Sequence, residues 1–121
     1  MKENMKNISV IGLGSMGYGI AQSLIRSGYM VYGQDKNLVQ QKKIVKEGGQ
    51  GDEISYDDLD AIIVVVLNEV QTREIIFGND GIAAKLNKNT LVMVCTTVSP
   101  NFAKEMATLC ENKGLLYLDA P

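Results

Sequence analysis

The chain has 121 residues, the length of one domain, and can bury an ordinary hydrophobic core without a disulfide or a metal. Its residues are 45% hydrophobic and 21% charged, which excludes a disordered or collagen-like chain. Twelve basic and 14 acidic residues give a net charge of −2 without a long block of one sign, so neither nucleic acid nor an anionic membrane is an expected partner.

The first half of the chain alternates compact apolar runs with helical patterns. Gly28 is typical of a residue that ends a helix, and Asn37 is typical of one that begins a helix. The predicted elements, in chain order, are a strand at 8–11, a helix at 15–27, a strand at 29–34 and a helix from 38 that ends at Gly48 and Gly49.

The second half continues the same rhythm after residues 50–60, where the pattern is weakest and fits a short strand around Glu53 and Ile54 and a single turn at 55–59. Glu69 and Arg73, four positions apart, are expected to pair and support one helix. The remaining predicted elements are a strand at 61–67, a helix at 68–77, a strand at 91–95, a helix begun by Ser99 and Pro100 and ended by Gly114, and a strand at 115–118. Strand and helix in this alternation predict a doubly wound parallel α/β sheet.

A Gly-x-Gly-x-x-Gly hexapeptide joins the first predicted strand to the first predicted helix. The pattern alone is weak in a chain with 12 glycines, but this strand–turn–helix context is that of a Rossmann-type dinucleotide-binding domain. The first glycine allows the tight turn, the second lets the main chain approach a pyrophosphate, and the third lets the helix pack on the strand. The helix N–H groups would then face the phosphates. The candidate residues are Gly12, Leu13, Gly14, Ser15, Met16 and Gly17.

Asp35 ends the second predicted strand about 20 residues after the glycines, where a carboxylate accepts hydrogen bonds from the adenosine ribose. The same carboxylate would repel a 2′-phosphate, which favours NAD over NADP as the cofactor. Lys36 weakens this preference because a cation beside the ribose tolerates a phosphate.

The turn allows three other interpretations. The hexapeptide could be a tight turn without a ligand, with Asp35 as a surface cap. A Walker phosphate loop fits poorly because no Gly-Lys-Ser/Thr follows the glycines. A methyltransferase also has a glycine-rich first turn and an acid after the second strand, but it does not need the third glycine.

Three motifs in order resemble the β-hydroxyacid dehydrogenase family, which includes 3-hydroxyisobutyrate dehydrogenase. They are the hexapeptide with Ala21, Leu24 and Gly28 after it, the run from Cys95 to Pro100, and the closing Leu118-Asp119-Ala120-Pro121. Asn68, Gln71-Thr72 and Phe77-Gly78 resemble most the L-threonate dehydrogenase branch. Val66-Leu67 stands where the family usually has Leu-Pro, which leaves the path of that loop open.

The resemblance implies roles for four more residues. Val66 and Leu67 would lie against the adenosine and ribose, Gln71 near the cofactor, and Thr97 at the nicotinamide ribose. The residues alone also allow a sheet-core role for Val66 and Leu67, and a loop hydroxyl that caps the next helix for Thr97.

The resemblance further implies that the chain is the N-terminal domain, residues 1–121, of a longer enzyme that forms a homo-oligomer. In the family, the residues that hold the substrate carboxylate follow Asp-Ala-Pro, and the catalytic lysine lies in an all-helical C-terminal domain, which is expected to be absent here. No catalytic residue is therefore assigned to this chain. The full enzyme would move a hydride between the nicotinamide and a small 3-hydroxyacid or sugar acid. Alternatives are a non-catalytic NAD(H) sensor and an NADPH-dependent semialdehyde reductase.

The chain contains no histidine, so a Ser-His-Asp triad and histidine metal ligands are absent, and no metal site is expected. Cys95 and Cys110 have neither a Cys-x-x-Cys spacing nor ligand partners. They are interpreted as reduced thiols, with a disulfide as the less favoured alternative, and Cys95 as a small buried apolar residue. No apolar run is long enough to cross a bilayer, and we expect a cytoplasmic protein.

Overall fold

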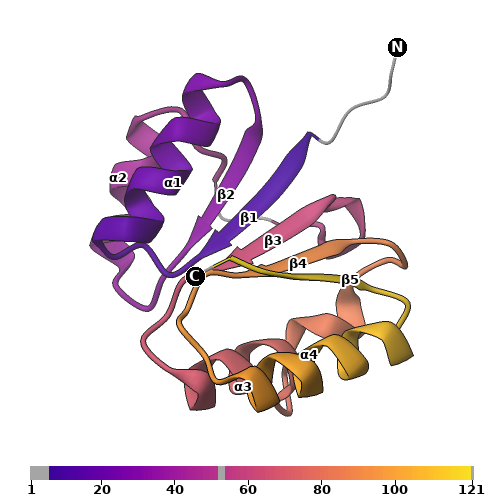
Figure 1. The fold of residues 1–121 in the computed structure, drawn as a ribbon. Coiled ribbons are helices and arrows are strands. Elements are labelled where there is room, and N and C mark those ends of the chain that lie inside the picture. Colours follow the sequence, from indigo (N-terminus) through magenta and orange to yellow (C-terminus); the bar gives the residue numbers. More distant parts are fainter. Residues whose placement is uncertain (1–5, 52–53, 121) are drawn as a thin grey trace.

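The computed structural model describes residues 6–51 and 54–120 and contains a five-stranded, wholly parallel sheet. Its strand order is β2-β1-β3-β4-β5 (Figure 1). The strands are β1 (Asn7–Ile11), β2 (Met30–Gln34), β3 (Ala61–Val64), β4 (Leu91–Val94) and β5 (Leu116–Asp119). The winding direction reverses between β1 and β3, so the predicted doubly wound sheet is confirmed.

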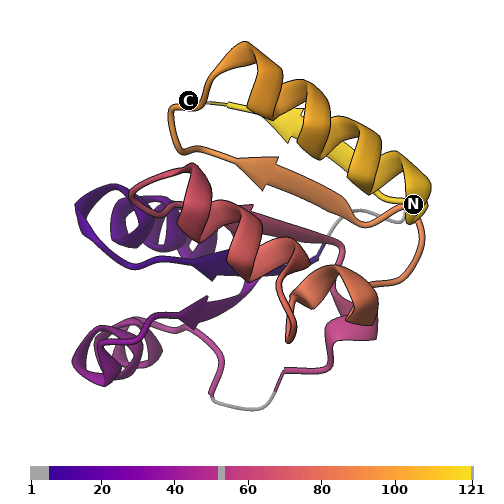
Figure 2. The ribbon, with the colours of Figure 1, turned by 90° about the horizontal axis from the view of Figure 1, so that it is seen from below.

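Helices cover both faces of the sheet. α1 (Ser15–Arg26) and α2 (Leu38–Lys46) lie on one face, and α3 (Glu69–Phe77) and α4 (Pro100–Asn112) on the other, as Figures 1 and 2 show. Because side chains of a strand alternate between faces, β3 contributes to two separate cores. Ala61 and Ile63 pack in the core under α1 and α2, whereas Ile62 and Val64 pack in the core under α3 and α4. Covering on both faces explains why this strand is continuously apolar.

Two strands, β3 and β4, end earlier than predicted. β3 ends at Val64, before the apolar run at 61–67 does, because the neighbouring strand β1 ends at Ile11. The Val65 N–H still donates to the Ile11 carbonyl oxygen at 2.8 Å, but the Val66 N–H binds Oγ1 of Thr96 at 3.2 Å. The prediction of a strand through Leu67 was therefore wrong, and β4 likewise ends one residue before Cys95.

In its described residues, 50–51 and 54–60, the weakly patterned middle segment contains a turn and no strand. The turn predicted at 55–59 is a 3₁₀ helix, η1 (Tyr56–Asp58). Ile54 belongs to no strand, so the strand expected there is wrong at that residue, and Glu53 lies outside the described residues. The chain makes a main-chain bond to the edge of β2 from the Gln50 N–H to the Val31 carbonyl oxygen, at 2.7 Å. A second 3₁₀ helix, η2 (Ile82–Lys85), was not predicted.

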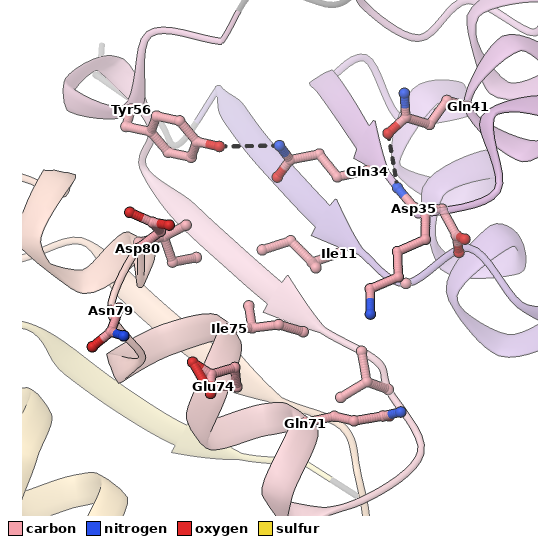
Figure 3. A pocket seen from close by; sticks show the side chains of 14 residues that line it. Ile11, Gln34, Asp35, Gln41, Tyr56, Gln71, Glu74, Ile75, Asn79 and Asp80 are labelled. Carbon is pink, nitrogen blue, oxygen red and sulfur yellow. Dashed lines mark hydrogen bonds between the residues drawn. The ribbon is translucent and has the colours of Figure 1, made fainter.

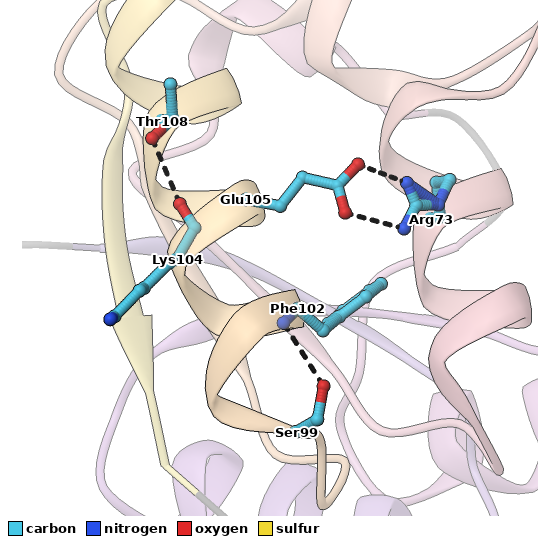
Figure 4. Close-up of polar contacts among 6 residues, drawn as sticks. All are labelled: Arg73, Ser99, Phe102, Lys104, Glu105 and Thr108. Carbon is cyan, nitrogen blue, oxygen red and sulfur yellow. Dashed lines mark hydrogen bonds and ion pairs between the residues drawn. The ribbon is translucent and has the colours of Figure 1, made fainter.

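The expected ion pair within α3 is replaced by contacts to α4 (Figure 4). Arg73 binds both carboxylate oxygens of Glu105, at 2.5 and 2.8 Å, and lies over the Phe102 ring. Glu69 accepts the Ser99 N–H at 2.7 Å. The Arg73–Glu105 pair is nearly half exposed on both sides, so it is worth at most about 1 kcal/mol and mainly aligns the two helices.

Both cysteines are free, as interpreted from the sequence, and both are buried, as expected for Cys95. Desolvation raises the pKa of the Cys95 thiol, with a further rise from the charge of Asp119, and raises the pKa of Cys110 to about 11. Because the thiolate is the reactive form, neither cysteine should react at neutral pH while the chain is folded. We expect an aromatic disulfide reagent to label both thiols in denaturant and neither in the native chain; rapid native labelling would contradict the burial.

In the described part of the chain, no helix is long and apolar enough to cross a membrane.

Candidate functional site

The turn from β1 to α1 requires glycine at two positions. Gly12 has a φ of +100°, and a Cβ there would overlap the Val65 carbonyl oxygen. A Cβ on Gly17 would overlap the Gly12 carbonyl oxygen and lie 2.9 Å from the Gly12 carbonyl carbon. The start of α1 therefore rests directly on the main chain of the turn, as expected for the first and third glycines of the hexapeptide.

Gly14 has a different environment. It is the N-cap of α1, it is exposed, and no heavy atom within 4 Å would meet a Cβ there. Its φ of −71° and ψ of −170° are open to any residue, so the fold itself does not require glycine. What the missing side chain provides is open space in front of the helix.

The N-terminus of α1 has no side-chain cap. Asn37, Asn68 and Ser99 each accept a main-chain N–H at the start of the other three α-helices, whereas Gly14 offers no such acceptor. The first turn of α1 contains no acidic residue, and Ser15 and Met16 are exposed. Free N–H groups at the positive end of a helix are a ready site for an anion such as a phosphate.

Asp35 lies beside this turn. Its Oδ2 accepts the Leu13 N–H at 2.6 Å and its Oδ1 accepts the Asn37 N–H at 2.8 Å. A carboxylate has about four lone-pair sites, so both oxygens can accept further hydrogen bonds from a ligand. The Leu13 side chain is fully buried in the core, so this residue can offer a ligand only its main chain.

A cavity of about 790 Å³ opens where the winding direction reverses, beside the carboxyl ends of β1 and β2 (Figure 3). Open α/β sheets bind ligands in this crevice. The cavity brings together five predicted site residues, Gly12, Asp35, Lys36, Val66 and Gln71. The others that line it are Ile11, Gln34, Gln41, Tyr56, Glu74, Ile75, Asn79, Asp80 and Ile82.

The other seven predicted residues do not line the cavity: five belong to the turn and the start of α1 (Leu13, Gly14, Ser15, Met16 and Gly17), and two, Leu67 and Thr97, belong to later loops. Leu67 is 87% exposed, and its N–H donates to Oε1 of Gln71 at 2.9 Å, so a sheet-core role for Leu67 is wrong. Thr97 is exposed, whereas its neighbour Thr96 is 5% exposed and donates from Oγ1 to the Val66 carbonyl oxygen at 2.8 Å. Thr96 thus joins the loop after β4 to the loop after β3.

The charges at the cavity are mainly negative. Asp35, Glu74 and Asp80 bring three carboxylates, and Lys36 brings one ammonium group. The sequence analysis did not include Glu74 and Ile75 in the site. They lie three and four positions after Gln71, so helical spacing could have predicted that they line the same cavity. No group of three or more cysteine, aspartate or glutamate side chains among the described residues is placed to hold a metal ion.

A doubly wound parallel sheet whose first turn needs two glycines and leaves a helix N-terminus uncapped is the architecture of a Rossmann-type nucleotide-binding domain. The family model described as the NAD binding domain of 6-phosphogluconate dehydrogenase matches residues 7–121. The chain belongs to this family.

Dehydrogenases of the kind that the motifs indicated are among the chain's relatives. L-threonate dehydrogenase from Haemophilus influenzae is 38% identical over 100% of this chain and 42% of its own length. A crystal structure of 3-hydroxyisobutyrate dehydrogenase from Salmonella typhimurium superposes with a TM-score of 0.86 at 32% identity, over 93% of this chain and 40% of that one. The chain thus spans about two fifths of these relatives.

An imine reductase from Myxococcus stipitatus has the same fold. Two structures, each 25% identical, superpose with TM-scores of 0.82 for its V8 variant in complex with NAD+ and 0.83 for the enzyme in complex with NADP+. They match 95% and 93% of this chain, and 40% and 39% of their own. The fold therefore accommodates either dinucleotide, and the choice between them depends on local residues.

Proposed function

We propose that this chain holds NAD across the sheet edge between β1 and β3. The pyrophosphate would lie at the N-terminus of α1, against the N–H groups of Ser15 and Met16. Asp35 would accept hydrogen bonds from the adenosine ribose, and the adenine would enter the cavity beside Val66 and Gln71. The observation that carries this proposal is the uncapped N-terminus of α1, open at Gly14 and next to the cavity.

We also propose NAD rather than NADP as the cofactor. A 2′-phosphate would bring a further negative charge next to Asp35, in a cavity that already has the carboxylates of Glu74 and Asp80. Lys36 offsets only part of this charge. The adenosine of NAD is uncharged, and its phosphates would remain outside the cavity at the positive end of α1.

For the whole protein we propose a hydride transfer between this cofactor and a small hydroxyacid of the L-threonate or 3-hydroxyisobutyrate type. The nicotinamide supplies the hydride chemistry when the cofactor is bound. The contribution of this chain is to position the dinucleotide, with Thr97 placed near the nicotinamide ribose at the carboxyl end of β4. The substrate-binding and catalytic groups would come from outside these residues.

Gly14 offers the cleanest test of the phosphate site. A Cβ at this position meets no protein atom within 4 Å, so we expect valine to leave the fold intact while its side chain fills the space in front of the helix. We expect NADH to give saturable fluorescence titration with the parent chain and Gly14→Val to weaken it at least about tenfold.

The matched control is Gly19→Ala on α1, where a Cβ also meets no atom within 4 Å. It should bind NADH as the parent does and unfold at a slightly higher temperature, because alanine favours a helix over glycine by about 1 kcal/mol. Unchanged NADH binding by a folded Gly14→Val variant would refute the proposed pyrophosphate position.

A further inference from the structure

The cavity reaches beyond the space next to Asp35, to a wall that carries two more carboxylates. Figure 3 shows Glu74 and Asp80 on the side opposite Asp35, with Ile11 and Ile75 between them. Glu74 lies in the last turns of α3 and Asp80 in the loop after it. In the described part of the structure, neither carboxylate has a hydrogen-bond donor or a cation as a partner.

The middle of the cavity is apolar. Ile11, Ile75, Val66 and Ile82 line it, and such side chains suit the flat face of a purine ring. The apolar stretch runs between the carboxylate proposed to hold the ribose and the carboxylates at the far wall (Figure 3). A base attached to that ribose would therefore place its outer edge at the far wall.

The far wall also offers one hydrogen-bond donor. Buried Ser9 donates to Oε1 of Gln34 at 3.1 Å, and Nε2 of Gln34 donates to the Tyr56 hydroxyl oxygen at 3.1 Å. The Tyr56 hydroxyl thus has an acceptor site in use and keeps its own hydrogen for another partner. Ionised carboxylates only accept hydrogen bonds, so the wall combines two acceptor groups with one donor.

Adenine presents the complementary edge, an exocyclic amino group that donates next to a ring nitrogen that accepts. Hypoxanthine reverses this edge: a carbonyl oxygen replaces the amino group, and the neighbouring ring nitrogen carries a hydrogen. In the same pose, that carbonyl oxygen would face carboxylates that cannot donate. We propose that Glu74 and Asp80 select an amino-bearing purine, adenine over hypoxanthine, at the far end of this cavity. The proposal rests on the proposed function, because it requires the dinucleotide to lie with its ribose at Asp35.

The test compares NAD with nicotinamide hypoxanthine dinucleotide by calorimetric titration of the chain. A hydrogen bond to a charged group is strong, and leaving a polar group without a partner is costly. We therefore expect the hypoxanthine dinucleotide to bind at least about tenfold more weakly than NAD. In the double variant Glu74→Gln with Asp80→Asn, the amides can donate to the carbonyl oxygen, and the ratio of the two affinities should fall towards one. Both side chains are exposed, so the variant should fold as the parent does.

Glu111→Gln is the control, since it removes a negative charge on an exposed residue of α4 that does not line the cavity. It should leave the ratio unchanged. Equal affinity of the parent chain for the two dinucleotides would overturn the inference while leaving the proposed function intact. A preference for NAD that survives in the double variant would also overturn it. Failure of the parent to bind either dinucleotide would refute the proposed function, and this inference with it.

Discussion

Replacing Gly17 by alanine should lower the free energy of unfolding by at least about 3 kcal/mol, although only one methyl group is added. The new Cβ would overlap the Gly12 carbonyl oxygen, which belongs to the main chain and cannot move aside as a flexible side chain would. Either α1 lifts away from the turn or the turn opens. Both changes disturb packing around Ala21, which is fully buried under the same helix.

Denaturant unfolding followed by circular dichroism would measure this loss. Gly19→Ala adds the same methyl group two residues further along α1, into open space, and should not destabilise the chain. Gly12→Ala should be at least as damaging as Gly17→Ala, because it adds a positive φ to a clash with the Val65 carbonyl oxygen. Equal stability of the alanine variants at positions 17 and 19 would show that the turn is not packed as described.

The contrast among these glycines separates what the fold needs from what a ligand needs. Gly12 and Gly17 are required by the protein's own main chain, so their presence alone says little about binding. A Cβ at Gly14 would meet no protein atom within 4 Å, so the missing side chain has no structural reason within the described residues. Among the three, Gly14 is therefore the position at which binding can be tested without disturbing the fold.

The sequence predicted the elements well where local chemistry determines them. Asn37 and Ser99 begin helices as expected, because their side chains accept main-chain N–H groups two and three residues further along the chain. The length of the apolar run after Ala61 was misleading, because Val65 and Val66 are apolar for a different reason. They pack beside the glycine turn after the strand has ended, a contact that no periodicity within the run reveals.

The sequence predicted the candidate site only on the side of the cavity next to Asp35. Asp35, Lys36 and Gln71 follow from motif and resemblance, and all three line the cavity. The far wall is formed in part by Tyr56 and Asp80, in or next to short segments that carry no helical or strand period. At the end of β4, strand alternation could not tell which of two adjacent threonines turns inward, and the structure buries Thr96.

Asp35→Asn is the second substitution with a large expected effect, because it changes the fold and the proposed site together. The carboxylate accepts the Leu13 N–H and the Asn37 N–H through different oxygens. Asparagine keeps one acceptor oxygen, and its amino group would face a second donor, so one of the two bonds is lost. The free energy of unfolding should fall by about 1–3 kcal/mol, the cost of leaving such a donor unpaired.

The same substitution should lower the affinity for NAD by about tenfold or more, because a charged acceptor for the ribose hydroxyls is replaced by a neutral group that both donates and accepts. The affinity for NADP should fall less, because the substitution removes the negative charge next to its 2′-phosphate. The ratio of NAD to NADP affinity should therefore fall. Titrating both dinucleotides into the parent, Asp35→Asn and Glu111→Gln chains measures that ratio, and the last variant controls for net charge. Tighter binding of NADP than of NAD by the parent chain would mean that Lys36 outweighs the carboxylates of the cavity, and the assignment of NAD would then fail even though the dinucleotide site remained.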